Sequence, residues 1–394
     1  MRSSLLLLIA AAVLFSFSAP VHAQFQPFGM DIEWIDVGQC NPNLYRSDAY
    51  GSGVGYCPQL EAAARAGAQY LRFLTLWRWL EPNPPTGAPQ PSVPGQRTGQ
   101  HTYAWDTDPY GNQWDYFVNY CGSFSPTHCS GSPFQVIFTH VWAPAWARGS
   151  SCVDCSPLSG DANQCGDAGR SVQNTVNGSG YANQGTDTLF DYYYNFARHF
   201  QGRVKYYGVW NEPNNSCNFD ARYLGSTSGN YLNDFVSRYL FMAWNGTHQA
   251  DPSASVIAPE LMYGSGSCGG WFGCDWYTSW LQPLWQYFSS SMDIIGLHRY
   301  PGDHTGVRSN VQQVFNLTGG VRQVWVTEVG YDFSGDGSFQ SNEMYGTYVD
   351  NFNYTGYNWQ KTFYHDLWGG TKSLLNSDFS PRPSYNRYKS MTGH

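Results

Sequence analysis

The sequence predicts a single α/β domain with a (β/α)8 barrel fold, the TIM-barrel architecture. Short, almost continuously apolar runs alternate with amphipathic helical patterns along the chain. This alternation is typical of parallel strands joined by crossover helices, and eight strands can be counted. An open doubly wound sheet is the alternative. It would carry a glycine-rich phosphate turn after its first strand, and Asp36-Val-Gly-Gln-Cys40 is no such turn.

Six of the expected strands contain few charges, as in strands that are buried on both faces, and one more at each end completes the barrel. In chain order they are Pro27–Trp34, Gln69–Trp77, Phe134–His140, Val204–Trp210, Ala254–Ala258, Asp293–Leu297, Val321–Thr327 and Thr362–Trp368. Apolar stripes and alanine-rich composition between the strands predict helices. These are expected at Leu60–Ala68, Thr186–Phe200, Tyr231–Trp244, Trp276–Phe288 and Ser341–Phe352.

The composition narrows the class of partner. Only 13% of the 394 residues are charged, against about 25% in ordinary soluble domains, and the net charge is −8. Nucleic acid and anionic membrane surfaces need clustered lysine and arginine, so neither is expected as a partner. With 17% aromatic and 42% hydrophobic residues, the chain can bury a core and is not disordered.

The first 23 residues are expected to be a signal peptide. Arg2 precedes the apolar run Leu5–Phe17, and Val21-His-Ala23 is a small-x-small cleavage site. Residues 24–394 would then form the barrel domain of a secreted protein, which we expect to be a monomer. No other segment approaches the ~20 apolar residues that span a bilayer.

Ten cysteines in an exported chain indicate disulfides. Their pairing stays open, although Cys121 with Cys129 and Cys268 with Cys274 are plausible loop staples. Zinc is the alternative, because Cys152-x2-Cys155 has the spacing of metal ligands, but no histidine stands at matching spacing nearby. Three stretches exceed what a minimal barrel needs, and each follows a strand. We expect them to be disulfide-braced loops around a cleft on the C-terminal face: 81–130, 149–185 and 261–275.

Two glutamates stand out by position. Glu212 ends a strand in Val209-Trp-Asn-Glu-Pro213, and Glu328 ends another in Trp325-Val-Thr-Glu-Val-Gly330. A charge that follows a buried strand is costly unless it meets water, a partner or a substrate. Two such carboxylates at the open end of one barrel suggest acid–base or nucleophilic work on one bond. For Glu212 alone, a helix cap or a surface acid is the alternative.

These motifs resemble clan A of the glycoside hydrolases. Its members are retaining (β/α)8 enzymes with an Asn-Glu pair ending strand four and a Glu ending strand seven, where Asn211-Glu212 and Glu328 fall in the expected strand order. Trp210-Asn-Glu-Pro-Asn214 and Thr327-Glu-Val-Gly-Tyr331 look most like family 39 and its endo-acting relatives. The resemblance implies a secreted enzyme that cleaves β-glycosidic bonds in a polysaccharide or oligosaccharide by double displacement. Glu212 would be the general acid/base and Glu328 the nucleophile.

The same resemblance implies further site residues. Asn211 would bind the sugar 2-hydroxyl, and Arg72 on the second strand would keep Glu328 ionised. His298 and Tyr300 follow the sixth strand and would line the site, with the tyrosine donating to Glu328. The plainer alternatives are a turn residue for Asn211, a structural ion pair for Arg72 and a satisfied buried group for His298.

Aromatic residues at strand ends suggest a platform for sugar rings. His140, Trp142 and Trp146 follow the third strand, and Trp368 ends the last one. Ring faces stack on sugars, although core packing is the alternative for any single tryptophan. The number of rings favours endo action modestly, and no metal or cofactor is implied.

Two other functions stay open. A transglycosylase would share every catalytic residue and differ only in its products. A catalytically silent carbohydrate-binding wall protein would bind sugars without turnover, although intact carboxylates argue against it. Of the five glycosylation sequons, the one at Asn214 is the least expected to be modified, because it lies so close to Glu212.

Overall fold

The structure is a computed structural model. It describes residues 28–32, 40–48, 51–106, 108, 113–120, 134–144, 146–147, 184–214, 232, 235–263 and 275–393. The expected signal peptide lies outside these residues. Within the described part of the chain, no helix is both long and apolar enough to cross a membrane.

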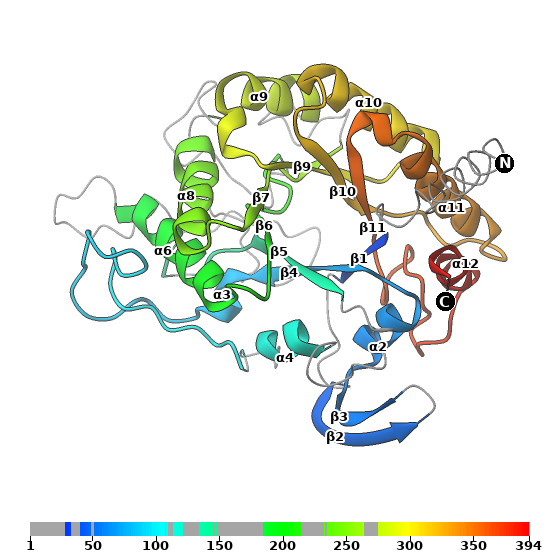
Figure 1. The fold of residues 1–394 in the computed structure, drawn as a ribbon, viewed down its shortest axis with the longest axis horizontal. Helices are drawn as coiled ribbons and strands as arrows, with labels where there is room; N and C mark the ends of the chain where they lie inside the picture. Colours follow the sequence, from blue (N-terminus) through cyan, green and yellow to red (C-terminus); the bar gives the residue numbers. More distant parts are fainter. Residues whose placement is uncertain are drawn as a thin grey trace, which may run out of the picture.

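Eight parallel strands form a closed barrel at the centre of the molecule (Figure 1). They are β1 (Phe28–Ile32), β4 (Tyr70–Leu76), β5 (Gln135–Val141), β6 (Tyr206–Gly208), β7 (Ser255–Ile257), β9 (Ile294–Arg299), β10 (Gln323–Val329) and β11 (Trp359–Tyr364). The barrel closes because β10 pairs with both β9 and β11, and β11 pairs in turn with β1. A short strand, β8 (Leu261–Met262), continues from β7 and pairs with the end of β9. The predicted barrel is therefore confirmed.

All eight expected strands are present, but the last one is shifted. Residues 362–368 were expected, whereas β11 begins at Trp359 and ends at Tyr364. After Tyr364 the Asp366 carboxylate accepts a hydrogen bond from the backbone N–H of Trp368 at 2.6 Å, which closes a turn. The prediction that Trp368 ends the strand is wrong, and its ring lies in the loop that follows.

Helices surround the barrel (Figure 1). The α-helices are α2 (Pro58–Arg65), α3 (Trp77–Leu80), α4 (Trp114–Asn119), α6 (Gln184–His199), α8 (Phe241–Ala250), α9 (Gln282–Phe288), α10 (His304–Thr318), α11 (Ser338–Asn353) and α12 (Pro383–Thr392). Short 3-10 or π-helical turns lie at η4 (Val236–Leu240), η5 (Trp276–Leu281), η6 (Ser289–Ser291) and η7 (Thr355–Tyr357). The five expected helical stretches all contain helix.

Helix α10 was not predicted, because its apolar stripe is narrow. Only Val307, Val311 and Val314 among its hydrophobic residues are buried. Its two ends nevertheless carry clear signals. The Asp303 carboxylate accepts from the Gly306 N–H at 3.1 Å, and Gly319 follows the last turn with a left-handed backbone.

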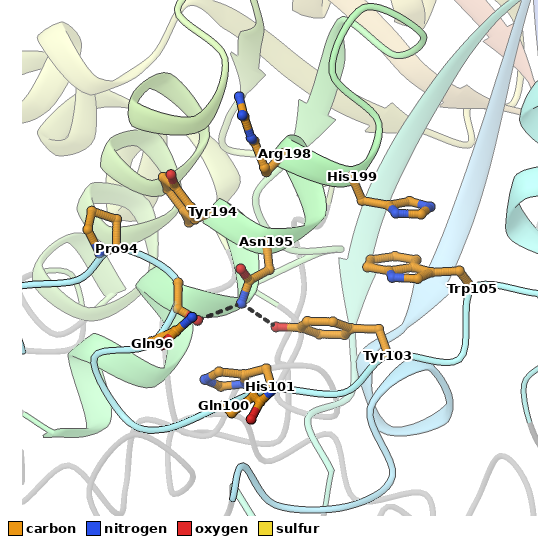
Figure 2. Close-up of a pocket in the computed structure, with 11 residues that line it drawn as sticks. Pro94, Gln96, Gln100, His101, Tyr103, Trp105, Tyr194, Asn195, Arg198 and His199 are labelled. Carbon is orange, nitrogen blue, oxygen red and sulfur yellow. Dashed lines mark hydrogen bonds between the residues drawn. The ribbon is translucent and has the colours of Figure 1, made fainter. Parts of the chain in front are cut away.

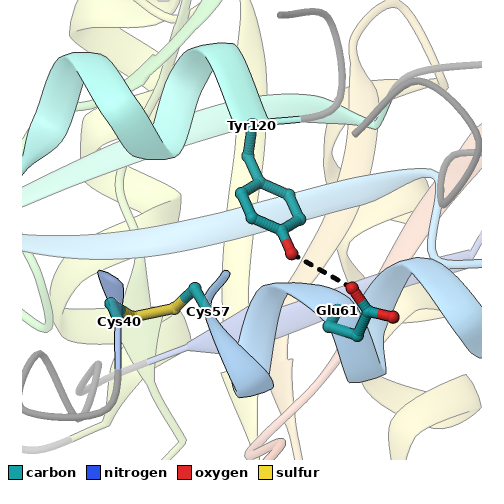
Figure 3. Close-up of a disulfide and its surroundings, with 4 residues drawn as sticks. All are labelled: Cys40, Cys57, Glu61 and Tyr120. Carbon is teal, nitrogen blue, oxygen red and sulfur yellow. Dashed lines mark hydrogen bonds between the residues drawn. A yellow bond between two sulfur atoms is a disulfide. The ribbon is translucent and has the colours of Figure 1, made fainter. Parts of the chain in front are cut away.

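A hairpin fills part of the loop after β1 and was not expected. Its antiparallel strands are β2 (Asn41–Asp48) and β3 (Gly51–Tyr56). A disulfide joins Cys40 to Cys57 at the base of the hairpin (Figure 3). The expected disulfide bracing of the three long loops is not supported. Among the described residues the disulfide lies in this hairpin, and the other eight cysteines, including Cys152 and Cys155, lie outside the described part.

The barrel interior is layered. Six buried side chains from six different strands pack together in one layer: Tyr70, Ile137, Ile257, Ile294, Trp325 and Phe363. Alternate residues of a strand face the same side, so the residues two positions further on also point inward. These include Arg72, Thr139 and Gly296. The apolar layer thus supports a polar layer nearer the C-terminal ends, where barrels bind their ligands.

Candidate active site

Arg72 lies at the centre of the polar layer and is fully buried. Its Nη1 donates to Asp31 Oδ1 and to Glu328 Oε1, both at 2.8 Å. Its Nη2 donates to Asn211 Oδ1 at 2.8 Å, and its Nε donates to Glu260 Oε1 at 3.0 Å. One guanidinium therefore joins four residues that lie in or just after four other strands, because its planar fork offers five donors.

Four acids contact Arg72 or the neighbouring His298, and we call them the carboxylate cluster: Asp31, Glu212, Glu260 and Glu328. Burial favours the neutral form of a carboxyl, but the Arg72 charge and hydrogen bonds outweigh it for two members. The pKa of Asp31 is lowered by Arg72 and by a hydrogen bond from His365, whose Nδ1 lies 2.7 Å from Asp31 Oδ2. The pKa of Glu260 is lowered by Arg72 and by a hydrogen bond from His298.

Glu328 leaves β10 at the open end of the barrel and is 6% exposed. Besides Arg72, the hydroxyl of Tyr300 donates to its Oε2, and His298 Nδ1 lies 3.3 Å from its Oε1. Arg72, Tyr300 and His298 thus hold the two carboxyl oxygens of Glu328 from both sides.

Glu212 follows β6 and turns into the same space. Its backbone is left-handed, with φ of 47°, which is uncommon for a residue other than glycine and is often found at functional sites. The Glu212 N–H donates to the Glu260 carbonyl at 3.0 Å, and the preceding Asn211 N–H donates to the His140 carbonyl at 2.9 Å. The side chain then reaches His298, whose Nδ1 lies 3.0 Å from Glu212 Oε1.

The two sequence-predicted glutamates converge. One carboxyl oxygen of Glu212, one of Glu328 and a ring nitrogen of His298 all lie within 4.8 Å of one another. The structure also brings Asn211, Arg72 and Tyr300 to this point.

His298 carries positive charge at neutral pH. Burial would lower its pKa, but the Glu328 charge and hydrogen bonds to Glu212 and Glu260 outweigh burial and raise the pKa to about 9. Arg72 Nη2 approaches His298 Nε2 to 3.3 Å. Because arginine only donates, this contact is a hydrogen bond only while the imidazole is neutral. The surrounding acids favour the imidazolium, so His298 acts mainly as a donor to the glutamates.

His140 was expected to contact substrate, but the structure does not bring it into the carboxylate cluster. The side chain is fully buried, and its Nδ1 lies 2.8 Å from the hydroxyl of Tyr192 on α6. Its ring packs edge-on against Tyr193 and Phe196 of the same helix. Burial lowers its pKa to about 3, although the Glu260 charge acts in the opposite direction. His140 is therefore a neutral packing residue behind the barrel wall.

This burial predicts a specific acid sensitivity. The folded pKa lies below the unfolded value of 6.5, so the unfolded chain binds an extra proton and stability falls as the pH drops from about 6.5 towards 3. The slope is about 1.4 kcal/mol per pH unit. Urea unfolding at pH 7 and pH 5 should show a loss about 2 kcal/mol larger in the wild type than in His140→Gln. Equal losses in the two proteins would contradict this role.

The three tryptophans of the expected sugar platform all contact other parts of the protein. Trp142 follows β5, and the Arg78 guanidinium lies over its ring at 4.8 Å. Trp146 donates through Nε1 to the Glu81 carbonyl at 3.0 Å. Trp368 stacks on Phe379 with ring centres 5.1 Å apart. All three are partly buried and lie on loops that follow barrel strands.

Sequence reasoning missed two members of the carboxylate cluster. Glu260 follows the apolar run 254–259, which is the same signal that marked Glu212 and Glu328. Asp31 is an acid inside an otherwise apolar strand, and such a residue needs a buried partner.

Among the residues that the structure describes, two sets of three side chains have metal-like spacing, with ligand atoms within 4.8 Å of one another: Glu212, His298 and Glu328, and Asp31, Glu328 and His365. Glu328 belongs to both sets, and Arg72 Nη1 already donates to it and to Asp31 at 2.8 Å. The guanidinium supplies the positive charge that a cation would otherwise bring.

A separate cavity of about 470 Å³ lies between α6 and the long loop that precedes α4 (Figure 2). Asn195 of α6 fastens this loop by donating to the Gly95 carbonyl at 2.9 Å and to the Tyr103 hydroxyl at 3.3 Å. None of the residues that line this cavity belongs to the carboxylate cluster.

The described fold agrees with comparisons to known proteins. Residues 185–359 match the family model described as "Glycosyl hydrolase catalytic core". This segment contains Glu212, Glu260, His298 and Glu328. The match confirms the expected resemblance to glycoside hydrolases. No curated protein sequence matches the chain significantly.

Solved structures of glycosidases share the barrel. A family 39 glycoside hydrolase from the gut symbiont Bacteroides cellulosilyticus WH2 is 16% identical, with a TM-score of 0.53 over 85% of this chain. The chain spans 60% of that protein's length. A monomeric β-xylosidase from Caulobacter crescentus CB15 is 14% identical, with a TM-score of 0.53 over 92% of this chain and 67% of that one. A β-glucosidase is 13% identical, with a TM-score of 0.55 over 94% and 98%. At these identities the likeness shows a shared fold.

Proposed function

We propose that the protein is a retaining glycoside hydrolase that cleaves β-glycosidic bonds in a polysaccharide or oligosaccharide. The observation that carries the proposal is the convergence of Glu212 and Glu328, which bring carboxyl oxygens within 4.8 Å of each other from two strand ends. Retaining glycosidases hold their two carboxyls about 5–5.5 Å apart, and inverting ones leave about 6.5–9.5 Å for a water. The spacing here supports retention.

In the first step Glu328 attacks the anomeric carbon while the glycosidic C–O bond breaks. Glu212 gives its proton to the departing oxygen, so the leaving group departs as an alcohol and a glycosyl ester forms on Glu328. Arg72 and Tyr300 donate hydrogen bonds to Glu328 and orient its carboxyl group for this attack. Asn211 has its amide oxygen bound by Arg72, which leaves its NH2 group to bind the sugar 2-hydroxyl.

In the second step the Glu328 charge is gone and Glu212 is ionised. Glu212 takes a proton from water, the water oxygen attacks the anomeric carbon, and the ester bond to Glu328 breaks. His298 donates to Glu212 Oε1 from 3.0 Å and, as an imidazolium, stabilises the ionised form in this step.

We also propose secretion and endo action. The N-terminal apolar run supports the first, and the tryptophans on the loops that follow barrel strands support the second. The glycosidases of similar fold include a β-xylosidase and a β-glucosidase, which makes β-linked xylans and glucans the first substrates to try.

A substrate panel tests the proposal. Xylan, mixed-linkage β-glucan, laminarin and mannan, with aryl β-xylosides and β-glucosides, are incubated with the protein, and new reducing ends are counted. Glu343→Gln serves as a matched control, because Glu343 lies on α11 and pairs with His304 outside the carboxylate cluster. Turnover by the wild type and this control, but not by Glu328→Gln, is expected. No turnover anywhere would favour a silent binding protein, and longer products would indicate a transglycosylase.

A further inference from the structure

Glu260 is a buried carboxylate with no part in the two chemical steps. Its side chain is fully buried in the polar layer, and the residue lies between β7 and β8. Two glycines on strands β6 and β9 leave room for it. A Cβ at Gly208 would collide with Glu260 Oε2, and a Cβ at Gly296 would lie 2.7 Å from Glu260 Cγ. A carboxylate in this interior is costly unless it has a partner, so its presence asks for a reason.

The side chain of Glu260 fixes the orientation of Arg72. Arg72 Nε donates to Glu260 Oε1 at 3.0 Å and to Thr139 Oγ1 at 3.0 Å. With Nε held on this side, the planar guanidinium directs Nη1 at Glu328 and Nη2 at Asn211. The position of the proposed nucleophile therefore depends on a contact that Glu260 makes on the far side of Arg72.

The backbone of Glu260 holds the other glutamate. Its carbonyl accepts from the Glu212 N–H at 3.0 Å, and Glu212 has the left-handed backbone that turns its side chain into the site. Asn211 and Glu260 also form an isolated parallel bridge. Glu260 thus contacts Glu212 through its backbone carbonyl, and it acts on Glu328 through Arg72.

We propose that Glu260 is a positioning residue for the reaction, setting the spacing between Glu328 and Glu212 through Arg72 and through its own carbonyl. This inference rests on the proposed function, in which both glutamates act on one bond. The negative charge of Glu260 also acts on the charged and titratable groups around it. The charged and titratable groups that face it are Arg72, His140, Tyr193, Glu212, His298 and Glu328.

Glu260→Gln tests the side-chain part of the proposal. The amide keeps the shape, and Asp31 and Glu328 still compensate Arg72, so the variant should fold. A shift of the guanidinium by a fraction of an ångström should lower kcat by about 10- to 100-fold while KM changes by less than about 3-fold. Loss of a negative charge stabilises the ionised forms of nearby acids, so both limbs of the pH–rate profile should move to lower pH.

Two matched variants separate positioning from general packing. Glu260→Asp keeps the charge on a shorter side chain, so its kcat should fall while both limbs stay at their wild-type pH. Asp293→Asn is the control, because Asp293 directly precedes β9, at the end of the strand that is far from His298, and pairs there with His248. Removing this half-buried carboxylate should leave the pH–rate profile unchanged. The proposal would be overturned if both limbs of the Glu260→Gln pH–rate profile stay at their wild-type pH. It would also be overturned if Asp293→Asn shifts the pH–rate profile as much as Glu260→Gln does. If Glu260→Gln does not fold, wild-type kcat in Glu260→Asp would overturn it.

A second readout does not need activity. The His298 imidazole, whose pKa is about 9, is titrated by NMR in the wild type and in both Glu260 variants. The pKa should fall in Glu260→Gln and stay near the wild-type value in Glu260→Asp. An unchanged titration in Glu260→Gln would overturn the proposal even if no sugar is cleaved. Failure of the proposed function alone would appear as an inactive wild type in which the His298 titration still depends on Glu260.

Discussion

Glu328→Gln is expected to lower kcat by at least about 10⁴-fold, which corresponds to roughly 5 kcal/mol of lost transition-state stabilisation. The amide keeps the size of the side chain but cannot form the glycosyl ester, because it is a far weaker nucleophile than a carboxylate. The amide oxygen can still accept from Arg72 Nη1, and the amide NH2 can donate to the Tyr300 hydroxyl, so the fold should survive.

Steady-state kinetics on the best substrate of the panel measures this loss. Circular dichroism and urea unfolding check that the variant is folded. Glu343→Gln, the same substitution on α11, should stay within about 2-fold of the wild type. Residual activity above one-hundredth of the wild type in folded Glu328→Gln would contradict the assigned role.

Glu212→Ala is expected to show a loss that depends on the leaving group. Cleavage of a natural glycosidic bond needs the proton from Glu212, so kcat/KM for an oligosaccharide should fall by about 10³-fold or more. A 2,4-dinitrophenyl glycoside needs no proton on its leaving oxygen, so kcat/KM for this substrate should change by less than about 10-fold.

Azide gives a second readout for the same variant. In Glu212→Ala the ester on Glu328 lacks its general base, so water attacks slowly. A small anion that needs no base should enter the space vacated beside His298 and release a β-glycosyl azide. Equal losses on both substrates, or an α-glycosyl azide, would contradict the acid/base assignment.

Much of the fold could be predicted because buried parallel strands appear as apolar runs and their crossover helices as amphipathic ones. The two glutamates were found by the same logic, since each follows such a run. Arg72 was expected beside Glu328, yet its full set of partners was not. Glu260 lies 188 residues from Arg72 in the sequence and Glu328 lies 256 residues from it. Which of these distant acids contact the Arg72 guanidinium is determined only when the barrel closes.

The remaining differences also have physical reasons. His140 follows a predicted strand, but α6 covers its side chain, and helix packing against a strand cannot be read from the strand alone. Trp368 was placed at a strand end, but β11 ends at Tyr364, and the Asp366 carboxylate accepts from the Trp368 N–H in the turn that follows. Glu260 also follows an apolar run, so the argument used for Glu212 would have identified it if every predicted strand had been considered.

The most direct test of the central claim is mass spectrometry of the protein after reaction with an activated 2-deoxy-2-fluoro glycoside of the best sugar. Fluorine at C2 slows both steps, and a good leaving group keeps the first one fast enough for a glycosyl ester to accumulate. Convergence of Glu212 and Glu328 on one anomeric carbon predicts a single added fluoroglycosyl group on the peptide that contains Glu328, and none in Glu328→Gln. A label on another residue, or an active enzyme that acquires no label and releases the inverted anomer, would contradict the account.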